Sequence, residues 1–236
     1  RVDRRAGDTR RRVSARVPGA LDEAVGDRRG RPHVKICGIT RAEDAEVAAA
    51  CGASAIGFVF WDRSPRAVSL EAATDVAAAV PRGVLRVGVF VNALPHLVRR
   101  YVAHVPLDVV QLHGDEPVDW ADAFGRPVIK AVDPAERAHE AWLAAPPGAA
   151  TLLVDAVDRA RRGGTGALSD WEAAAALARR RPVVLAGGLR PENVAAAVAA
   201  VRPYAVDVSS GVEASPGVKD PARLRALFEG LAEASK

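Results

Sequence analysis

The chain has 236 residues, 49% of them hydrophobic and 26% charged, which is the composition of an ordinary globular protein. No run of 18 apolar residues occurs, so a membrane span is excluded, and two cysteines are too few for a disulfide framework. The net charge is +4, but residues 33–236 hold 23 basic and 24 acidic residues, so the basic excess lies in residues 1–32. A nearly neutral globular part argues against a nucleic-acid partner.

The first segment, 1–32, is rich in Arg, is broken by Gly and Pro, and has almost no apolar periodicity. We expect a disordered basic extension here, either a linker or an over-extended start. The segment lacks the apolar core of a secretory signal, and its five acidic residues do not fit a transit peptide. With two cysteines expected as free thiols, the sequence predicts a cytoplasmic protein.

From His33 onward, short apolar runs alternate with Ala-rich segments, which predicts eight strand–helix units. The runs are 33–37, 54–60, 85–91, 108–112, 127–131, 151–155, 182–186 and 204–209. Each is rich in Val, Ile, Leu or Phe, as is typical of buried parallel strands. Eight units predict one α/β domain over 33–236, a (β/α)8 TIM barrel. The alternative is an open doubly wound sheet, which has fewer strands and often a Gly-x-Gly-x-x-Gly turn that this sequence lacks.

Helix signals lie between the runs. The start signals are two capping boxes at 40–43 and 169–172, and three acid–Pro pairs that end in Pro117, Pro134 and Pro221. Gly52 and Pro81 are placed to end the first two helices.

Polar residues and glycines gather where the runs end, which in a barrel is where the active site lies. Three glycine-rich loops follow the sixth, seventh and eighth runs, and their backbone N–H groups suit a phosphate. The predicted phosphate-binding residues are Gly163, Gly164, Gly187, Gly188, Ser209, Ser210 and Gly211. Nucleotide and metal motifs (Walker A, HExxH, CxxC) are absent, so we predict a phosphorylated small substrate and no cofactor.

Cys37 and Asp155 end the first and sixth runs. If both side chains point into the barrel mouth, a thiol and a carboxyl group are available for acid–base catalysis. Cys37 taken alone also fits a small buried hydrophobe, and Asp155 also fits a cap or a partner for Arg.

Four further residues at strand ends are candidates for substrate binding. Arg66 could hold a carboxylate with its two-pronged guanidinium, or it could be a surface Arg. His113 could carry a proton or be a hydrogen-bonded structural residue. Asp207 shares a face with Ser209, and Gln111 lies at the same strand end as His113.

The motifs that carry these residues resemble the phosphoribosylanthranilate isomerase family of tryptophan biosynthesis. The segments are VKICGIT (34–40), GFVFWDRSPRAV (57–68), VGVFVN (87–92), VQLHGDE (110–116), LLVDA (152–156), GGTGALSDW (163–171), LAGGLRPENV (185–194) and DVSSGVEASPGVKD (207–220). The resemblance runs from about His33 to the C-terminus. One departure is Ser169, where the family commonly has Phe.

The resemblance implies an Amadori rearrangement without a metal or organic cofactor. The substrate would be N-(5'-phosphoribosyl)anthranilate and the product 1-(2-carboxyphenylamino)-1-deoxyribulose 5-phosphate. In this family the corresponding Cys is the general base and the corresponding Asp the general acid, which assigns these roles to Cys37 and Asp155. Arg66 would contact the anthranilate carboxylate, and the glycine-rich loops would bind the phosphate.

Two alternatives stay open at this point. One is another phosphosugar barrel, such as the histidine/tryptophan dual-pathway isomerase or indole-glycerol-phosphate synthase. The other is a non-catalytic phosphosugar-binding barrel. Either a monomer or a homodimer suits the fold, possibly associated with or once fused to another tryptophan-pathway enzyme.

Overall fold

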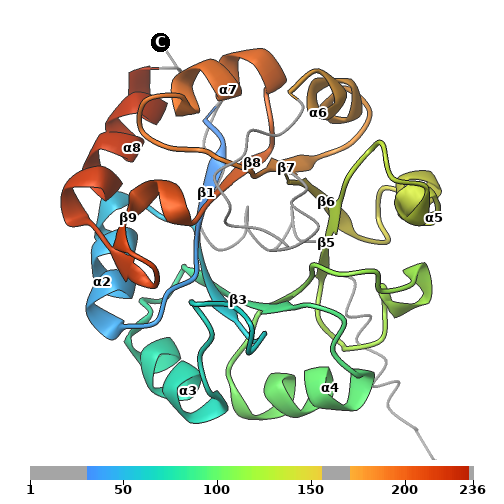
Figure 1. Ribbon diagram of the computed structural model, residues 1–236, viewed down its shortest axis with the longest axis horizontal. Helices are drawn as coiled ribbons and strands as arrows, with labels where there is room; N and C mark the ends of the chain where they lie inside the picture. The colour runs from blue at the N-terminus through green and yellow to red at the C-terminus, as the bar shows by residue number, and fades with distance from the viewer. Residues whose placement is uncertain (1–30, 156–170, 234–236) are drawn as a thin grey trace, which may run out of the picture.

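The computed structural model describes residues 31–155 and 171–233, which form a closed barrel of eight parallel strands ringed by helices (Figure 1). The strands are β1 His33–Cys37, β2 Ala55–Val59, β3 Leu85–Phe90, β4 Val109–Leu112, β5 Val128–Val132, β6 Thr151–Val154, β7 Val183–Leu185 and β8 Ala205–Val208. Each predicted apolar run overlaps one strand, so the predicted TIM barrel is confirmed. The predicted extension over 1–32 lies outside the described residues, apart from its last two.

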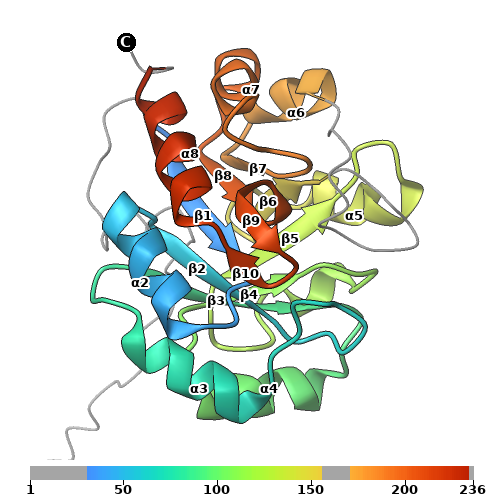
Figure 2. The ribbon, with the colours of Figure 1, turned by 60° about the vertical axis from the view of Figure 1, so that its left-hand side comes forward.

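Helices cover the outside of the barrel. They are α2 Ala42–Cys51, α3 Leu70–Ala79, α4 Pro95–His104, α5 Glu140–Ala144, α6 Trp171–Ala178, α7 Val194–Val201 and α8 Pro221–Glu233, with single 3-10 turns at η1 Val118–Trp120, η2 Arg137–His139 and η3 Ser210–Val212. A short antiparallel pair, β9 Glu213–Ser215 and β10 Val218–Lys219, precedes α8 near the ends of β1 and β8 (Figure 2). None of the described helices has both the length and the apolar character needed to cross a bilayer.

Both faces of the barrel strands are buried, which explains why the runs are continuously apolar rather than alternating. Alternate residues such as Ile56, Leu152 and Val206 belong to the large core that includes residues of the surrounding helices. The other set, with Val87 and Leu153, forms a second cluster among strand residues. A third, small cluster, which contains Cys37, Val59 and Val89, lies nearest the carboxyl ends of the strands. The cluster at the barrel mouth therefore includes a buried thiol.

Three predicted helix boundaries were confirmed, at Gly52, Pro81 and Pro221. Gly52 ends α2 in a left-handed conformation with φ 107°, and Pro81 follows the C-cap of α3. Pro221 is the first residue of α8, and Asp220 Oδ1 accepts a hydrogen bond from the N–H of Ala222 at 2.8 Å.

Three predicted helix starts were wrong, and a fourth, at 169–172, begins outside the described residues. The N-cap of α2 is Arg41, because the Thr40 hydroxyl instead donates to the Gly217 carbonyl at 2.6 Å. Pro117 precedes only a 3-10 turn, since the carboxylate of Glu116 is buried in an ion pair. Pro134 lies in a turn, and the next α-helix begins at Glu140.

The ion pair of Glu116 and Lys130 is the most deeply buried one among the described residues, with an N–O distance of 2.8 Å. The carboxylate of Glu116 also accepts hydrogen bonds from the backbone N–H groups of Asn92 and Gly114, at 2.8 and 2.9 Å. These contacts join the ends of β3, β4 and β5. A buried pair with its remaining hydrogen bonds satisfied is tolerated, whereas removal of one partner costs about 3–5 kcal/mol. The pair therefore fixes one side of the barrel mouth.

Candidate active site

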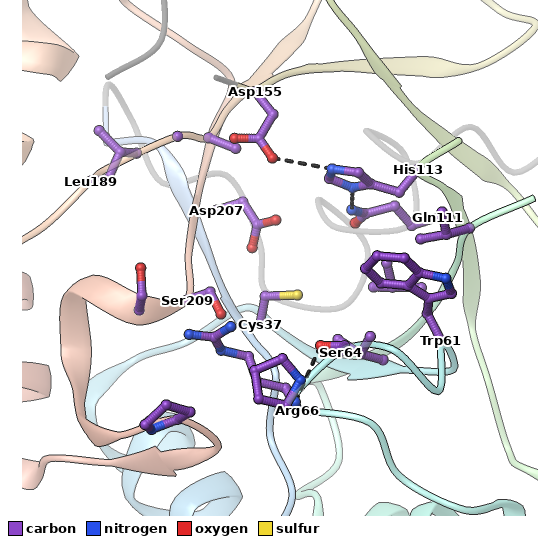
Figure 3. Close-up of a pocket in the computed structure, with 18 of the residues that line it drawn as sticks. Cys37, Trp61, Ser64, Arg66, Gln111, His113, Asp155, Leu189, Asp207 and Ser209 are labelled. Carbon is purple, nitrogen blue, oxygen red and sulfur yellow. Dashed lines mark hydrogen bonds and ion pairs between the residues drawn. The ribbon is translucent and has the colours of Figure 1, made fainter. Parts of the chain in front are cut away.

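A cavity of about 510 Å³ opens at the carboxyl ends of the barrel strands (Figure 3). Ten of the residues predicted from the sequence line it: Cys37, Arg66, Gln111, His113, Asp155, Gly187, Gly188, Asp207, Ser209 and Ser210. Gly211 lies just outside, where a Cβ would overlap the Leu189 carbonyl oxygen, so it allows two neighbouring loops to approach closely. Gly163 and Gly164 lie outside the described residues.

The thiol of Cys37 points into the cavity from the end of β1 (Figure 3). Gly57 on the neighbouring strand makes room for it, because a Cβ at that position would lie 2.9 Å from Sγ. Burial raises the pKa of the Cys37 thiol, the Lys35 ammonium opposes this rise, and the Asp207 carboxylate adds to it. The thiolate form of Cys37 therefore depends on the charges beside it.

Lys35 and Asp207 form a buried ion pair with an N–O distance of 2.8 Å, next to Cys37. The two residues are paired in register because β1 hydrogen-bonds to β8. Burial alone would lower the pKa of Lys35, but Asp207 and Cys37 raise it above its usual value. Lys35 is thus held as a cation beside the thiol. It was not predicted as a site residue, because a Lys inside an apolar strand gives no sign of the partner it will meet.

Replacing Lys35 by Met is expected to raise the pKa of the Cys37 thiol further, because the cation that favours the thiolate is removed. If the thiolate is the active form, kcat/KM at pH 7 falls about tenfold or more, and the limb of its pH profile that follows ionisation of the thiol moves to higher pH. The measurement is a pH series of kcat/KM, with thiolate absorbance of the free enzyme as a direct readout. Lys35→Arg keeps the cation and is the control. An unmoved limb in Lys35→Met would contradict the role of this charge.

Asp155 directly follows β6, and its carboxylate points into the cavity toward His113 (Figure 3). Asp155 Oδ2 lies 3.1 Å from His113 Nε2, and His113 Nδ1 lies 2.9 Å from Gln111 Nε2. The side chains of Asp155 and His113 are each 13% exposed, so this chain of contacts is largely shielded from bulk water. The sequence predicted all three residues but not that they contact one another.

Arg66 is 9% exposed, and Glu213 already engages one edge of its guanidinium. Arg66 Nε donates to Glu213 Oε1 at 2.8 Å, and Arg66 Nη2 donates to Oε2 at 2.6 Å. Burial alone would raise the pKa of Glu213, but Arg66 and Lys219 lower it. Lys219 Nζ contacts the same carboxylate at 2.8 Å, so the three side chains carry a net charge of +1. The Nη1 edge of Arg66 has no hydrogen-bond partner among the described residues and suits a second carboxylate.

The loop after β7 contains two consecutive residues with positive φ, Gly187 at 85° and Gly188 at 62°. A residue with a Cβ would be strained at these positions. Asn193 fixes the loop, because its side chain donates to the Gly188 carbonyl at 3.0 Å and accepts from the N–H of Arg190 at 2.9 Å. Ser209 and Ser210 face this loop across the cavity rim, where η3 begins. The arrangement leaves space and small residues for an anion.

Several functional residues escaped the sequence interpretation. Charged side chains from distant parts of the chain contact the predicted residues or one another; they are Lys35, Glu213 and Lys219. The cavity also has apolar walls, which include Trp61 and Leu189. Trp61 lies in the 60–66 segment at the end of the second run, of which only Arg66 was predicted as a site residue. Within residues 31–155 and 171–233, no three His, Cys, Asp or Glu side chains are grouped as ligands of a metal ion would be.

Comparison with known proteins identifies the family. Residues 34–230 match the model of the N-(5'-phosphoribosyl)anthranilate (PRA) isomerase family. The N-(5'-phosphoribosyl)anthranilate isomerase of Pseudomonas aeruginosa UCBPP-PA14 is 48% identical over 204 residues, which cover 84% of this chain and 94% of the relative.

Two solved structures are similar over nearly their whole length. The phosphoribosyl anthranilate isomerase of Thermus thermophilus is 46% identical with a TM-score of 0.76, covering 85% of this chain and 98% of its own. The enzyme of Thermotoga maritima is 41% identical with a TM-score of 0.78, covering 86% and 99%. The chain therefore belongs to the N-(5'-phosphoribosyl)anthranilate isomerase family, the aldose–ketose isomerases of tryptophan biosynthesis.

Proposed function

We propose that the cavity catalyses the Amadori rearrangement of N-(5'-phosphoribosyl)anthranilate to 1-(2-carboxyphenylamino)-1-deoxyribulose 5-phosphate, with Cys37 as general base and Asp155 as general acid. The observation that carries these roles is that both side chains point into one cavity at the carboxyl ends of the strands. A thiol and a carboxyl group are sufficient for the two proton transfers that the reaction requires.

The proposed reaction begins when Asp155 donates its proton to the ribose ring oxygen. The C1–O bond breaks, and the nitrogen lone pair forms the iminium. The Cys37 thiolate then removes the proton from C2, and the electrons of that C–H bond form the enolamine. The enolamine tautomerises to the ketone, and proton exchange with solvent restores the acid form of Asp155 and the thiolate of Cys37.

The substrate would lie across the cavity with its two charged ends on different loops. We assign the phosphate to the loops that contain Gly187, Gly188, Ser209 and Ser210, with Gly211 supporting their approach. Gly163 and Gly164, which lie outside the described residues, are also predicted to bind the phosphate. The Nη1 edge of Arg66 suits the anthranilate carboxylate, because Glu213 occupies the opposite edge.

The sugar hydroxyls would lie between these two ends. Asp207 Oδ1 is buried without a hydrogen-bond partner among the described residues, and the side chain lines the cavity. A buried acceptor without a partner is costly, so a substrate hydroxyl that donates to Oδ1 would gain a favourable contact. The predicted substrate-binding residues Gln111 and His113 lie on the side of Asp155.

Relatives of known structure support the small-molecule assignment. One phosphoribosyl anthranilate isomerase, 40% identical with a TM-score of 0.74, was solved with reduced 1-(o-carboxyphenylamino)-1-deoxyribulose 5-phosphate. The Thermotoga maritima enzyme is described as dimeric. For this chain we keep a monomer or a homodimer, a cytoplasmic location and a possible link to another tryptophan-pathway enzyme as proposals. Light scattering on the purified protein distinguishes the first two.

The function is tested by generating phosphoribosylanthranilate in situ and following the loss of its fluorescence with purified protein. We expect a decay whose rate is proportional to enzyme concentration. A folded protein that causes no decay would contradict the activity. Retained binding of the reduced product analogue would then favour a non-catalytic phosphosugar-binding barrel, and activity on a different phosphosugar would favour another barrel enzyme.

A further inference from the structure

We propose that His113, oriented by Gln111, is a positioning residue that holds the Asp155 carboxyl group by its Oδ2 atom and leaves Oδ1 to deliver the proton. This inference rests on the proposed function, because it assigns a role to the neighbours of the proposed acid. It also changes the interpretation of His113 and Gln111, which the sequence placed in substrate binding.

In its present orientation, Gln111 fits one tautomer of His113. Its amide nitrogen, which can only donate, lies 2.9 Å from His113 Nδ1. Nδ1 must therefore accept, and the proton of the neutral imidazole is on Nε2. Gln111 is 1% exposed and belongs to β4, so its amide is held by the barrel rather than by solvent.

His113 in turn fixes the carboxyl group of Asp155. His113 Nε2 lies 3.1 Å from Oδ2, within ion-pair distance, whereas Oδ1 has no hydrogen-bond partner among the described residues. An N–H donor stabilises the carboxylate that forms when the acid gives up its proton. The contact therefore restricts the carboxyl group to one orientation.

The imidazole can be replaced without loss of the local backbone. The N–H of His113 donates to the Phe90 carbonyl at 2.8 Å, which fixes the strand end independently of the ring. The Glu116–Lys130 pair secures the following loop in the same way. Variants at His113 are therefore expected to fold, and melting temperature is the check.

The experiment compares His113→Phe, His113→Gln and Asp155→Ala with the double variant His113→Phe/Asp155→Ala in the fluorescence assay. We expect His113→Phe to lower kcat about 10- to 100-fold and to change KM by less than about threefold. His113→Gln keeps an amide donor on a side chain of similar reach and is expected to recover most of the loss. In the Asp155→Ala background, His113→Phe should have almost no further effect, because it acts through the missing carboxyl group.

Three outcomes would overturn the inference. The first is a kcat of His113→Phe within threefold of the wild type. The second is a raised KM at unchanged kcat, which would make His113 a substrate contact. The third is that the losses of the two single variants multiply in the double variant. The proposed function fails separately: if Asp155→Ala retains wild-type turnover, Asp155 is not the acid. An inactive Asp155→Ala with a normal His113→Phe rejects only the inference. Gln111→Leu should show a smaller loss than His113→Phe, since it removes only the partner that orients the ring.

Discussion

Replacing Cys37 by Ser is expected to lower kcat by about a thousandfold or more while the protein stays folded. A serine hydroxyl does not ionise near neutral pH, so it cannot remove the C2 proton as a thiolate does. The smaller oxygen fits beside Gly57, whose missing Cβ provides the space for the sulfur. The measurement is kcat in the phosphoribosylanthranilate assay, together with the melting temperature.

The chain provides a matched control for this substitution in its second cysteine. Cys51 is half-buried in α2, away from the cavity. Cys51→Ser is therefore expected to leave kcat and KM unchanged. Turnover of Cys37→Ser within tenfold of the wild type would contradict the role of Cys37 as the base. Equal losses in both variants would indicate a general effect of removing a cysteine.

Replacing Asp155 by Asn is expected to lower kcat by about a thousandfold, because an amide cannot donate a proton to the ring oxygen. The substitution keeps the shape of the side chain, and the amide oxygen can still accept from His113 Nε2, which lies 3.1 Å from Oδ2 in the wild type. KM is therefore expected to change little. Single-turnover measurements separate this chemical effect from product release.

The control for Asp155→Asn is the same exchange at Asp115, an exposed residue of the loop after β4 that does not line the cavity. Asp115→Asn is expected to retain near wild-type turnover. If Asp155→Asn raises KM strongly and leaves kcat unchanged, Asp155 binds the substrate and another group supplies the proton.

The sequence predicted the barrel and much of the cavity because both depend on patterns within single strand–loop units. Parallel strands buried on both faces require continuous apolar runs, and each of the eight runs overlaps a strand. Functional groups in this fold lie at the carboxyl ends of strands, so Cys37 and Asp155 could be placed without knowing how the strands pair.

Contacts between distant segments could not be predicted in the same way. Lys35 meets Asp207 across 172 positions, and Arg66 meets Glu213 across 147, because barrel closure and the β9–β10 hairpin bring them together. The same cause explains the wrong helix start at 40–43. Its Thr40 hydroxyl is used by Gly217, 177 residues away, and a local capping rule does not include such a competitor.

The contact between Lys219 and the backbone of Cys37 also bears on when a nascent chain can become active. Lys219 Nζ donates to the Cys37 carbonyl at 2.7 Å and to the Ser209 carbonyl at 3.1 Å, across 182 and 10 positions. During translation β1 is made well before β8 and Lys219. A ribosome-bound chain that ends before Lys219 holds the thiol without this cation and without an intact site. The site is therefore expected to be complete only after both β1 and Lys219 have been synthesised.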